Sequence, residues 1–180
     1  SKVTGGNFSK VTGGHNSTVI GGDDSTVTGG CCATVTGGND SKVTGEHSST
    51  VTGGNDSIVI GGNHSIVNGG NNSRIMGGDN SQVKSGDHST VIGGDDSEVI
   101  RSEERRVGKE YSTEVTGGHG RKVTGGNFSK VTGGHNSKVI GGDDSKVKGG
   151  RSATVSGGKD STVTEDQRSQ GTVGHGSKGR

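Results

Sequence analysis

The stretch STVTGG at residues 25–30 places three β-branched residues in front of a pair of glycines. β-Branched residues favour strands, whereas paired glycines favour turns. Six residues alone could be one strand of a folded unit or filler in a disordered chain. How often the stretch returns decides between these two interpretations.

The composition of the 180-residue chain is that of a low-complexity sequence, with 40 glycines, no proline, no tryptophan and a hydrophobic fraction of 21%. So little apolar surface cannot offset the ordering entropy of a conventional globule. The formal net charge is +1, and both signs are scattered along the chain. No apolar run is long enough to cross a bilayer. We therefore expect no conventional globular domain, no nucleic-acid partner and no membrane partner.

Blocks of eight residues run through the chain with the consensus S-x-V-x-G-G-x-x. The frame holds for 22 blocks (22 × 8 = 176 of 180 residues) without an inserted or deleted residue. A disordered linker has no physical reason to keep that frame, so the period indicates a repeat fold. Residues 121–150 also match residues 1–30 at 26 of 30 positions, which indicates growth by copying of whole blocks.

Each block is predicted to form a short strand, S-x-V-x, and a turn, G-G-x-x, whose Asn, Asp and His residues tolerate positive φ. Side chains alternate across a strand, so the first-position serine and the third-position valine share one face. That face repeats almost unchanged and is expected to be buried. The chain is therefore predicted to be an all-β repeat β-solenoid: a two-sheeted β-roll with about two octapeptides per coil and an inward valine ladder. Coils about 4.8 Å apart would form a rod roughly 50 Å long.

The predicted core is the column of third-position side chains. Its burial alone is too small to offset the backbone entropy of so glycine-rich a chain. Backbone ladders, serine rows, end caps or a second chain are expected to supply the rest, so we expect a marginal monomer or a homo-oligomer. The predicted core residues are Val3, Val11, Val19, Val27, Val35, Val43, Val51, Val59, Val67, Ile75, Val83, Val91, Val99, Val115, Val123, Val131, Val139, Val147, Val155 and Val163.

The octapeptide solenoid is predicted over residues 1–164. Within it, 101–112 is expected to form an irregular coil, because RSEERRVGKEY at 101–111 loses the double glycine and carries a charge cluster. A decorated loop and a binding insert are the other interpretations of this stretch. Residues 165–180 are expected to form a frayed or capping tail. Because Ser1 lies inside the repeat pattern, we expect a fragment or a processed form.

The sequence predicts no metal site, no cofactor and no enzymatic activity. The adjacent Cys31 and Cys32 can pair only in a strained ring and have no second cysteine pair with which to hold zinc. We interpret them as turn fillers, with a redox or intermolecular link as the alternative. The acidic turns lack the repeat pattern of calcium-binding β-rolls. Ser, His and Asp all recur as repeat filler, so none is singled out for catalysis. The histidines fall in separate blocks and are expected to form no ligand set, among them His15, His47, His64, His88, His119 and His135.

The outward positions, second and fourth in each block, are the candidate functional surface. With two blocks per coil, the third, fifth and seventh blocks stack on one sheet. Their side chains would form a grid with spacings of about 6.7 Å along a strand and about 4.8 Å between coils. These lengths are comparable to oxygen repeats in hexagonal ice, although threonine also suits any exposed strand. The candidate ice-binding residues are Thr18, Ile20, Thr34, Thr36, Thr50 and Thr52, with Thr26 and Thr28 on the opposite sheet.

The segment NFSKVTGGHNSTVIGG at 7–22 resembles the repeats of the grass ice-recrystallisation-inhibition (antifreeze) proteins, which carry N-x-V-x-G units in a two-sheeted β-roll. The likeness covers nearly the whole chain at motif level, although those repeats mostly have seven residues and begin with Asn. It implies a secreted, extracellular protein of the cold stress response that binds ice or ordered water. Lysines at outward positions, such as Lys2, Lys10 and Lys122, favour a weak inhibitor of recrystallisation over a strong antifreeze.

A structural or adhesive extracellular stalk is the alternative function. The short glycine-containing repeats with inward aliphatic residues are also similar to bacterial trimeric autotransporter heads, whose period is longer. A chain without a selected function is a third interpretation, which block copying permits. The repeat also spells glycosylation sequons, which are relevant only in a secreted chain; these begin at Asn7, Asn16, Asn39, Asn55, Asn63, Asn71 and Asn127.

Overall fold

The computed structural model is an all-β solenoid, which confirms the fold class predicted from the octapeptide period. It describes every residue except 87, 102–112, 119, 121, 127–128, 165, 167–168, 174–177 and 180. The stretch expected to form an irregular coil, 101–112, lies outside the described residues apart from Arg101, as do His119 and Asn127. The described part of the chain contains no helix that is long and apolar enough to span a bilayer.

Successive strands alternate between two parallel sheets of 11 strands each, which we name the odd sheet and the even sheet. The odd sheet contains β1 (Lys2–Thr4), β3 (Thr18–Ile20), β5 (Thr34–Thr36), β7 (Thr50–Thr52), β9 (Ile66–Asn68), β11 (Gln82–Ser85), β13 (Glu98–Arg101), β15 (Lys122–Thr124), β17 (Lys138–Ile140), β19 (Thr154–Gly157) and β21 (Gln170–Val173). The even sheet contains β2 (Lys10–Thr12), β4 (Thr26–Gly29), β6 (Lys42–Gly45), β8 (Ile58–Ile60), β10 (Arg74–Met76), β12 (Thr90–Ile92), β14 (Thr113–Thr116), β16 (Ser129–Thr132), β18 (Lys146–Lys148), β20 (Thr162–Thr164) and β22 (Lys178–Gly179).

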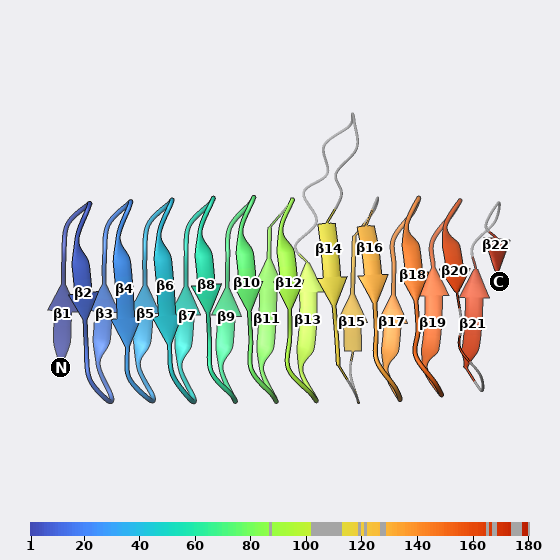
Figure 1. Cartoon of the computed structure of the whole chain (residues 1–180), viewed down its shortest axis with the longest axis horizontal. Coiled ribbons are helices and arrows are strands. Elements are labelled where there is room, and N and C mark those ends of the chain that lie inside the picture. Colours follow the sequence, from blue (N-terminus) through green and yellow to red (C-terminus); the bar gives the residue numbers. More distant parts are fainter. Residues whose placement is uncertain are drawn as a thin grey trace.

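One coil of the solenoid takes two octapeptides. Thr18 pairs with Thr34 and Thr34 with Thr50, so neighbouring strands of a sheet lie two blocks apart along the chain. Figure 1 shows the strands stacked along the long axis, with the turns after odd strands along one edge and the turns after even strands along the other. The step grows to three blocks where Thr90 pairs with Glu114 and Glu98 with Lys122. One extra octapeptide length therefore lies between β12 and β14. β14 still pairs in the even sheet, with Val115 opposite Val91.

The third-position side chains form the core between the two sheets. From Val11 to Val163 every described member of this column is at most 4% exposed, and Val3, in the first coil, is half-buried against it. Each strand contributes only one large apolar side chain. Parallel register places that side chain directly above the equivalent one in the next coil, as with Val19 and Val35. The core is therefore a continuous column rather than a cluster.

First-position serines form a second buried column beside the valines. The backbone N–H of Ser25 donates to Oγ of Ser41 (3.1 Å), and that of Ser41 donates to Oγ of Ser57 (3.2 Å). The hydroxyls in turn donate to carbonyls of the turns, as Ser41 Oγ does to Asn39 O at 3.0 Å. A buried polar group is tolerated only when it is hydrogen-bonded. The serine column thus satisfies the backbone where each turn enters a strand.

The turns contain a left-handed residue at the eighth position of the block. In the described part of the chain, all positive-φ residues other than glycine lie there, with φ from 51° at Asn16 to 58° at Cys32. Asn and Asp tolerate this region better than other non-glycine residues, which accounts for their frequency at this position. The two glycines that precede it are needed for another reason. A Cβ at Gly37 would lie 2.4 Å from Val43 Cγ2, and one at Gly38 would lie 2.7 Å from the backbone nitrogen of Asp23 in the preceding coil.

Both sheets continue past Thr164 into the predicted tail. β21 pairs with β19, and β22 pairs with β20. The register places Gly171 opposite Val155 and Gly179 opposite Val163, so glycine stands where earlier coils have a valine. These last two strands add backbone pairing to the stack without extending the valine column at those two positions.

Candidate functional site

The third, fifth and seventh blocks bring six outward side chains together on the odd sheet. We name this set the threonine grid: Thr18, Ile20, Thr34, Thr36, Thr50 and Thr52. Thr18, Thr34 and Thr50 follow one another in register, and Ile20, Thr36 and Thr52 form the parallel row. The pairing across coils places equivalent atoms about 4.8 Å apart, and the two rows lie about 6.7 Å apart along the strand.

The two rows of the threonine grid differ in exposure. The second-position residues Thr18, Thr34 and Thr50 are exposed, whereas the fourth-position residues beside the glycines are half-buried. β-Branched side chains have few rotamers, and cross-strand neighbours restrict them further. The methyl and hydroxyl groups of the grid are therefore held in a regular array rather than moving freely in water.

The threonine grid belongs to a longer uncharged part of the odd sheet. β9 continues the rows with Ile66, which is 46% exposed, and Asn68. Charged outward residues lie only beyond these four strands, with Lys2 in β1 and Lys84 in β11. On the odd sheet, four consecutive strands thus present outward side chains without a formal charge.

Thr26 and Thr28 lie on the even sheet, opposite the grid, and have different neighbours. Thr26 pairs with Lys10 on one side and with Lys42 on the other. A lysine ammonium is strongly hydrated, so the lysines on both sides break the regular array at this position. At β4 the second-position row of the even sheet is therefore interrupted by lysines, although Thr28 stays in register with Thr12 and Thr44.

The strands from β13 to β18 carry charged second-position residues on both sheets. Lys122 forms an ion pair with Glu98 across the odd sheet at 3.0 Å, and Lys130 forms one with Glu114 across the even sheet at 2.8 Å. Exposed pairs of this kind contribute about 0–1 kcal/mol to stability. Lysines also stack on one another without an acidic neighbour between them, as Lys130 does on Lys146. The strands from β13 to β18 thus present a more highly charged surface than the four odd-sheet strands β3, β5, β7 and β9.

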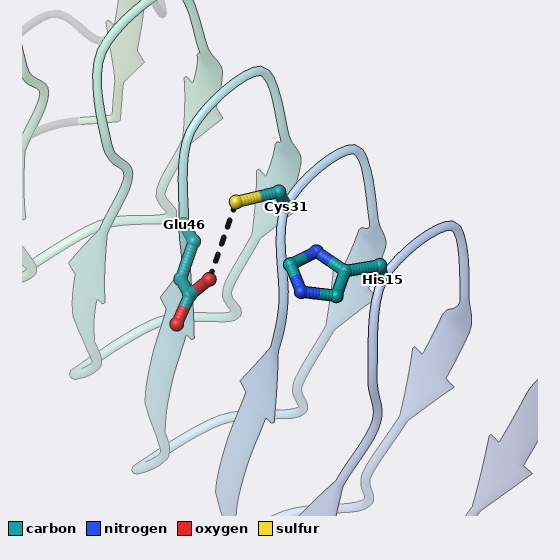
Figure 2. A group of neighbouring side chains, drawn as sticks. All are labelled: His15, Cys31 and Glu46. Atoms are coloured by element: carbon teal, nitrogen blue, oxygen red, sulfur yellow. Dashed lines mark hydrogen bonds between the residues drawn. The ribbon is translucent and has the colours of Figure 1, made fainter.

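A second group of chemically distinctive side chains lies at the edge formed by the turns after even strands. His15, Cys31 and Glu46 come from the turns after β2, β4 and β6, and their potential ligand atoms all lie within 4.8 Å of one another. The Cys31 thiol donates a hydrogen bond to Oε2 of Glu46 at 3.3 Å, as Figure 2 shows. Cys31 is half-buried, and the other two residues are exposed.

Sequence reasoning judged histidines and cysteines block by block and so missed this group. The signal that could have found it is the coil length. His15 and Cys31 lie two octapeptides apart in the sequence, and Glu46 follows Cys31 by one position less than that distance. Residues of one turn edge with that spacing lie in consecutive coils. The edge also holds a histidine pair, since the rings of His47 and His64 meet edge to face with centroids 5.0 Å apart.

Glu46 raises the pKa of the Cys31 thiol. The main cause is the hydrogen bond that the carboxylate accepts from the thiol, and partial removal of the thiol from water and the charge of Glu46 act in the same direction. A thiolate beside a carboxylate is disfavoured because two negative charges would then face each other. The carboxylate of Glu46 therefore disfavours ionisation of Cys31.

No protein-family model, no curated protein and no solved structure matches the chain.

Proposed function

We propose that the protein is a non-enzymatic, extracellular ice-binding protein that inhibits ice recrystallisation through the threonine grid. The observation that carries this proposal is the uncharged run of four coils on the odd sheet, with threonines in register at its centre. The motif-level resemblance to the grass ice-recrystallisation-inhibition proteins also supports it. The partner is ice or its ordered surface water.

The physical basis is an ordered water layer. Threonine methyl groups favour cage-like water around them, and the neighbouring hydroxyls can hydrogen-bond that water and fix its position. Where anchored waters repeat at spacings comparable to those of ice, the layer merges with the crystal surface. Adsorption at many points then slows the transfer of water from small crystals to large ones.

The activity is expected to be weak. The grid spans only three coils, and lysines such as Lys10 and Lys42 interrupt the opposite sheet. A hydrated ammonium group on an ice-facing surface must lose water before contact, which costs free energy. Inhibition of recrystallisation needs only slow, partial coverage of crystal surfaces, so a small grid suits it better than strong freezing-point depression.

The test is an ice-recrystallisation assay on wild type, the odd-sheet double variant Thr34→Lys with Thr50→Lys, and the even-sheet double variant Thr26→Lys with Thr90→Lys. All four substituted threonines are exposed second-position residues. Desolvating a new ammonium costs more than about 1.4 kcal/mol, so the odd-sheet variant should need at least about tenfold more protein for the same effect. The even-sheet variant should match wild type. Wild type that leaves crystal coarsening unchanged, or equal losses in both variants, would overturn the proposal.

A structural or adhesive extracellular stalk is the second proposal, and the lysine rows of β15–β18 favour it. Lys130 stacks on Lys146 in the even sheet, and Lys122 stacks on Lys138 in the odd sheet. Such rows suit a soluble spacer or contact with an anionic cell-wall polymer. Wild type that is inactive toward ice but sediments with a washed cell-wall fraction at low salt, and not at high salt, would support this function instead.

A further inference from the structure

We propose that His15, Cys31 and Glu46 form a binding site for a single zinc ion, with an imidazole, a thiolate and a carboxylate as ligands and a water molecule in the fourth position. The three side chains project from consecutive turns on one edge of the solenoid. Figure 2 shows the imidazole extending toward Cys31, and Glu46 meeting Cys31 from the other side. The proposal is independent of ice binding, because this edge lies apart from the outward rows of the odd sheet.

The distances are close to those that a tetrahedral zinc ion requires. With Zn–S of about 2.3 Å and Zn–O of about 2.1 Å, the sulfur and oxygen ligands of such an ion lie about 3.6 Å apart. Cys31 Sγ and Glu46 Oε2 are 3.3 Å apart, and all three ligand atoms lie within 4.8 Å of one another. Binding of the ion would bring the three ligand atoms to these separations by rotation of their side chains.

The donor set favours zinc over calcium and magnesium. Calcium and magnesium prefer six or more oxygen ligands, of which this group offers one carboxylate. Mixed nitrogen, sulfur and oxygen ligation in a four-coordinate geometry is typical of zinc. Binding breaks the S–H bond of Cys31 and forms an S–Zn bond, and the proton leaves to solvent. The zinc charge replaces the proton as the partner of both sulfur and carboxylate.

Glu46 breaks a local rule that the rest of the described repeat obeys. From Gly6 to Gly158, every other described sixth-position residue is glycine. Beyond the first coil the reason is steric: a Cβ at Gly30 would lie 3.0 Å from the nitrogen of His15, and one at Gly62 would lie 2.8 Å from the nitrogen of His47. A side chain at this position costs stability, and such departures are expected at functional sites. At Glu46 the departure supplies the third ligand.

The copied segment of the chain provides an internal comparison. His135 corresponds to His15 in the duplicated stretch, but Arg151 stands where Cys31 does. There the imidazole Nδ1 of His135 accepts a hydrogen bond from the backbone nitrogen of Arg151 at 2.9 Å. A histidine at this position can thus serve only to hydrogen-bond the turn of the next coil, without a metal-ligand set around it. The ligand set is complete only in the first copy.

The experiment is a cobalt titration of the full-length chain with its thiols kept reduced, followed by displacement with zinc. Wild type should bind one cobalt ion and show a thiolate-to-cobalt charge-transfer band with d–d bands of tetrahedral intensity. The matched variants are Cys31→Asn, His15→Asn and Glu46→Gly, each of which restores a residue found at that position in other coils. Cys32→Ser is the control, since it removes the neighbouring thiol outside the group.

Cys31→Asn should lose the charge-transfer band, and Cys32→Ser should keep it. His15→Asn and Glu46→Gly should weaken zinc affinity at least about tenfold, because even loss of an outer contact to a metal ligand costs about 10–100-fold. Circular dichroism on each variant verifies that the solenoid remains folded. The proposal is overturned if wild type shows no charge-transfer band, if the band survives in Cys31→Asn, or if it disappears in Cys32→Ser.

Discussion

Beyond the first coil, the paired glycines are required by contacts and not by their own backbone conformation. The left-handed position belongs to the eighth residue, such as Asp40 with φ of 52°. Gly37 instead makes room for a valine methyl group, and Gly38 makes room for the backbone of the preceding coil. The first requirement keeps the two sheets close enough to bury one valine per strand. The second sets how closely the coils can stack.

Gly38→Ala is predicted to lower the free energy of unfolding by about 1–3 kcal/mol, because the new Cβ would overlap the turn below. Its distances to Asp23 N and Gly22 C would be 2.7 and 2.8 Å. Gly14→Ala is the matched control, since a Cβ there meets nothing within 4 Å. That variant should be neutral or more stable by up to about 1 kcal/mol. Thermal melts followed by circular dichroism measure both, and equal midpoints would contradict the steric explanation.

At the scale of the strand and its turn, the valine column buries apolar surface and the serine column hydrogen-bonds the backbone beside it. Each block buries one apolar side chain and one hydroxyl, and the hydroxyl accepts the N–H of the equivalent serine one coil before, as Ser41 does from Ser25. Ala33 and Ala153 show that a block can do without this hydroxyl. The hydrogen bonds of this column are therefore expected to contribute individually, coil by coil.

Ser41→Ala is predicted to cost about 1–2 kcal/mol, because it removes one hydrogen bond and leaves the buried N–H of Ser25 without its acceptor. The fold should survive, as it does at Ala33. Thr26→Ala, an exposed substitution on a neighbouring strand, should change stability by no more than about 0.5 kcal/mol. Urea unfolding of the two variants beside wild type measures the difference. A Ser41 variant as stable as wild type would show that the serine column is not a source of stability.

The strands and the coil length could be predicted from the sequence, but the packing of the turns could not. A frame-locked valine requires a buried column, and an octapeptide period with a strand and a turn leads to two blocks per coil. The role of the glycines could not be predicted, because it depends on how close two coils approach. The lysines on both sides of Thr26 and the meeting of His15, Cys31 and Glu46 follow from the two-block coil. Both become visible in the sequence only when blocks two apart are compared.

At the scale of the whole molecule, the residues that hold the stack together are different from those that form its outer surface. The valine and serine columns are the same from coil to coil, so outward residues can vary without a change of fold. The three-block step between β12 and β14 shows that even an added block length preserves register and face. An uncharged stretch of the odd sheet suited to ice and lysine-rich coils can therefore coexist on one rod, and coils can be added singly.

Duplication of residues 33–48 is predicted to increase inhibition of ice recrystallisation about twofold or more, because it adds a third threonine pair, and so a fourth strand, to the grid and enlarges the contact area. Duplication of residues 73–88 is the matched control. It adds a coil of the same length, with no threonine among its outward residues, beyond the grid. Activity should then equal that of wild type. Equal gains in both duplicated chains would mean that length, and not the threonine grid, sets activity.

All of these expectations depend on two-block coils stacked on a dry valine column, and hydrogen–deuterium exchange followed by mass spectrometry tests that arrangement most directly. The parallel ladders predict strong, contiguous protection of backbone amides over 17–92, with faster exchange in the first coil, where Val3 is only half-buried. Exchange over 17–92 at the rate of an unstructured peptide would contradict the solenoid and remove the support from both proposed sites.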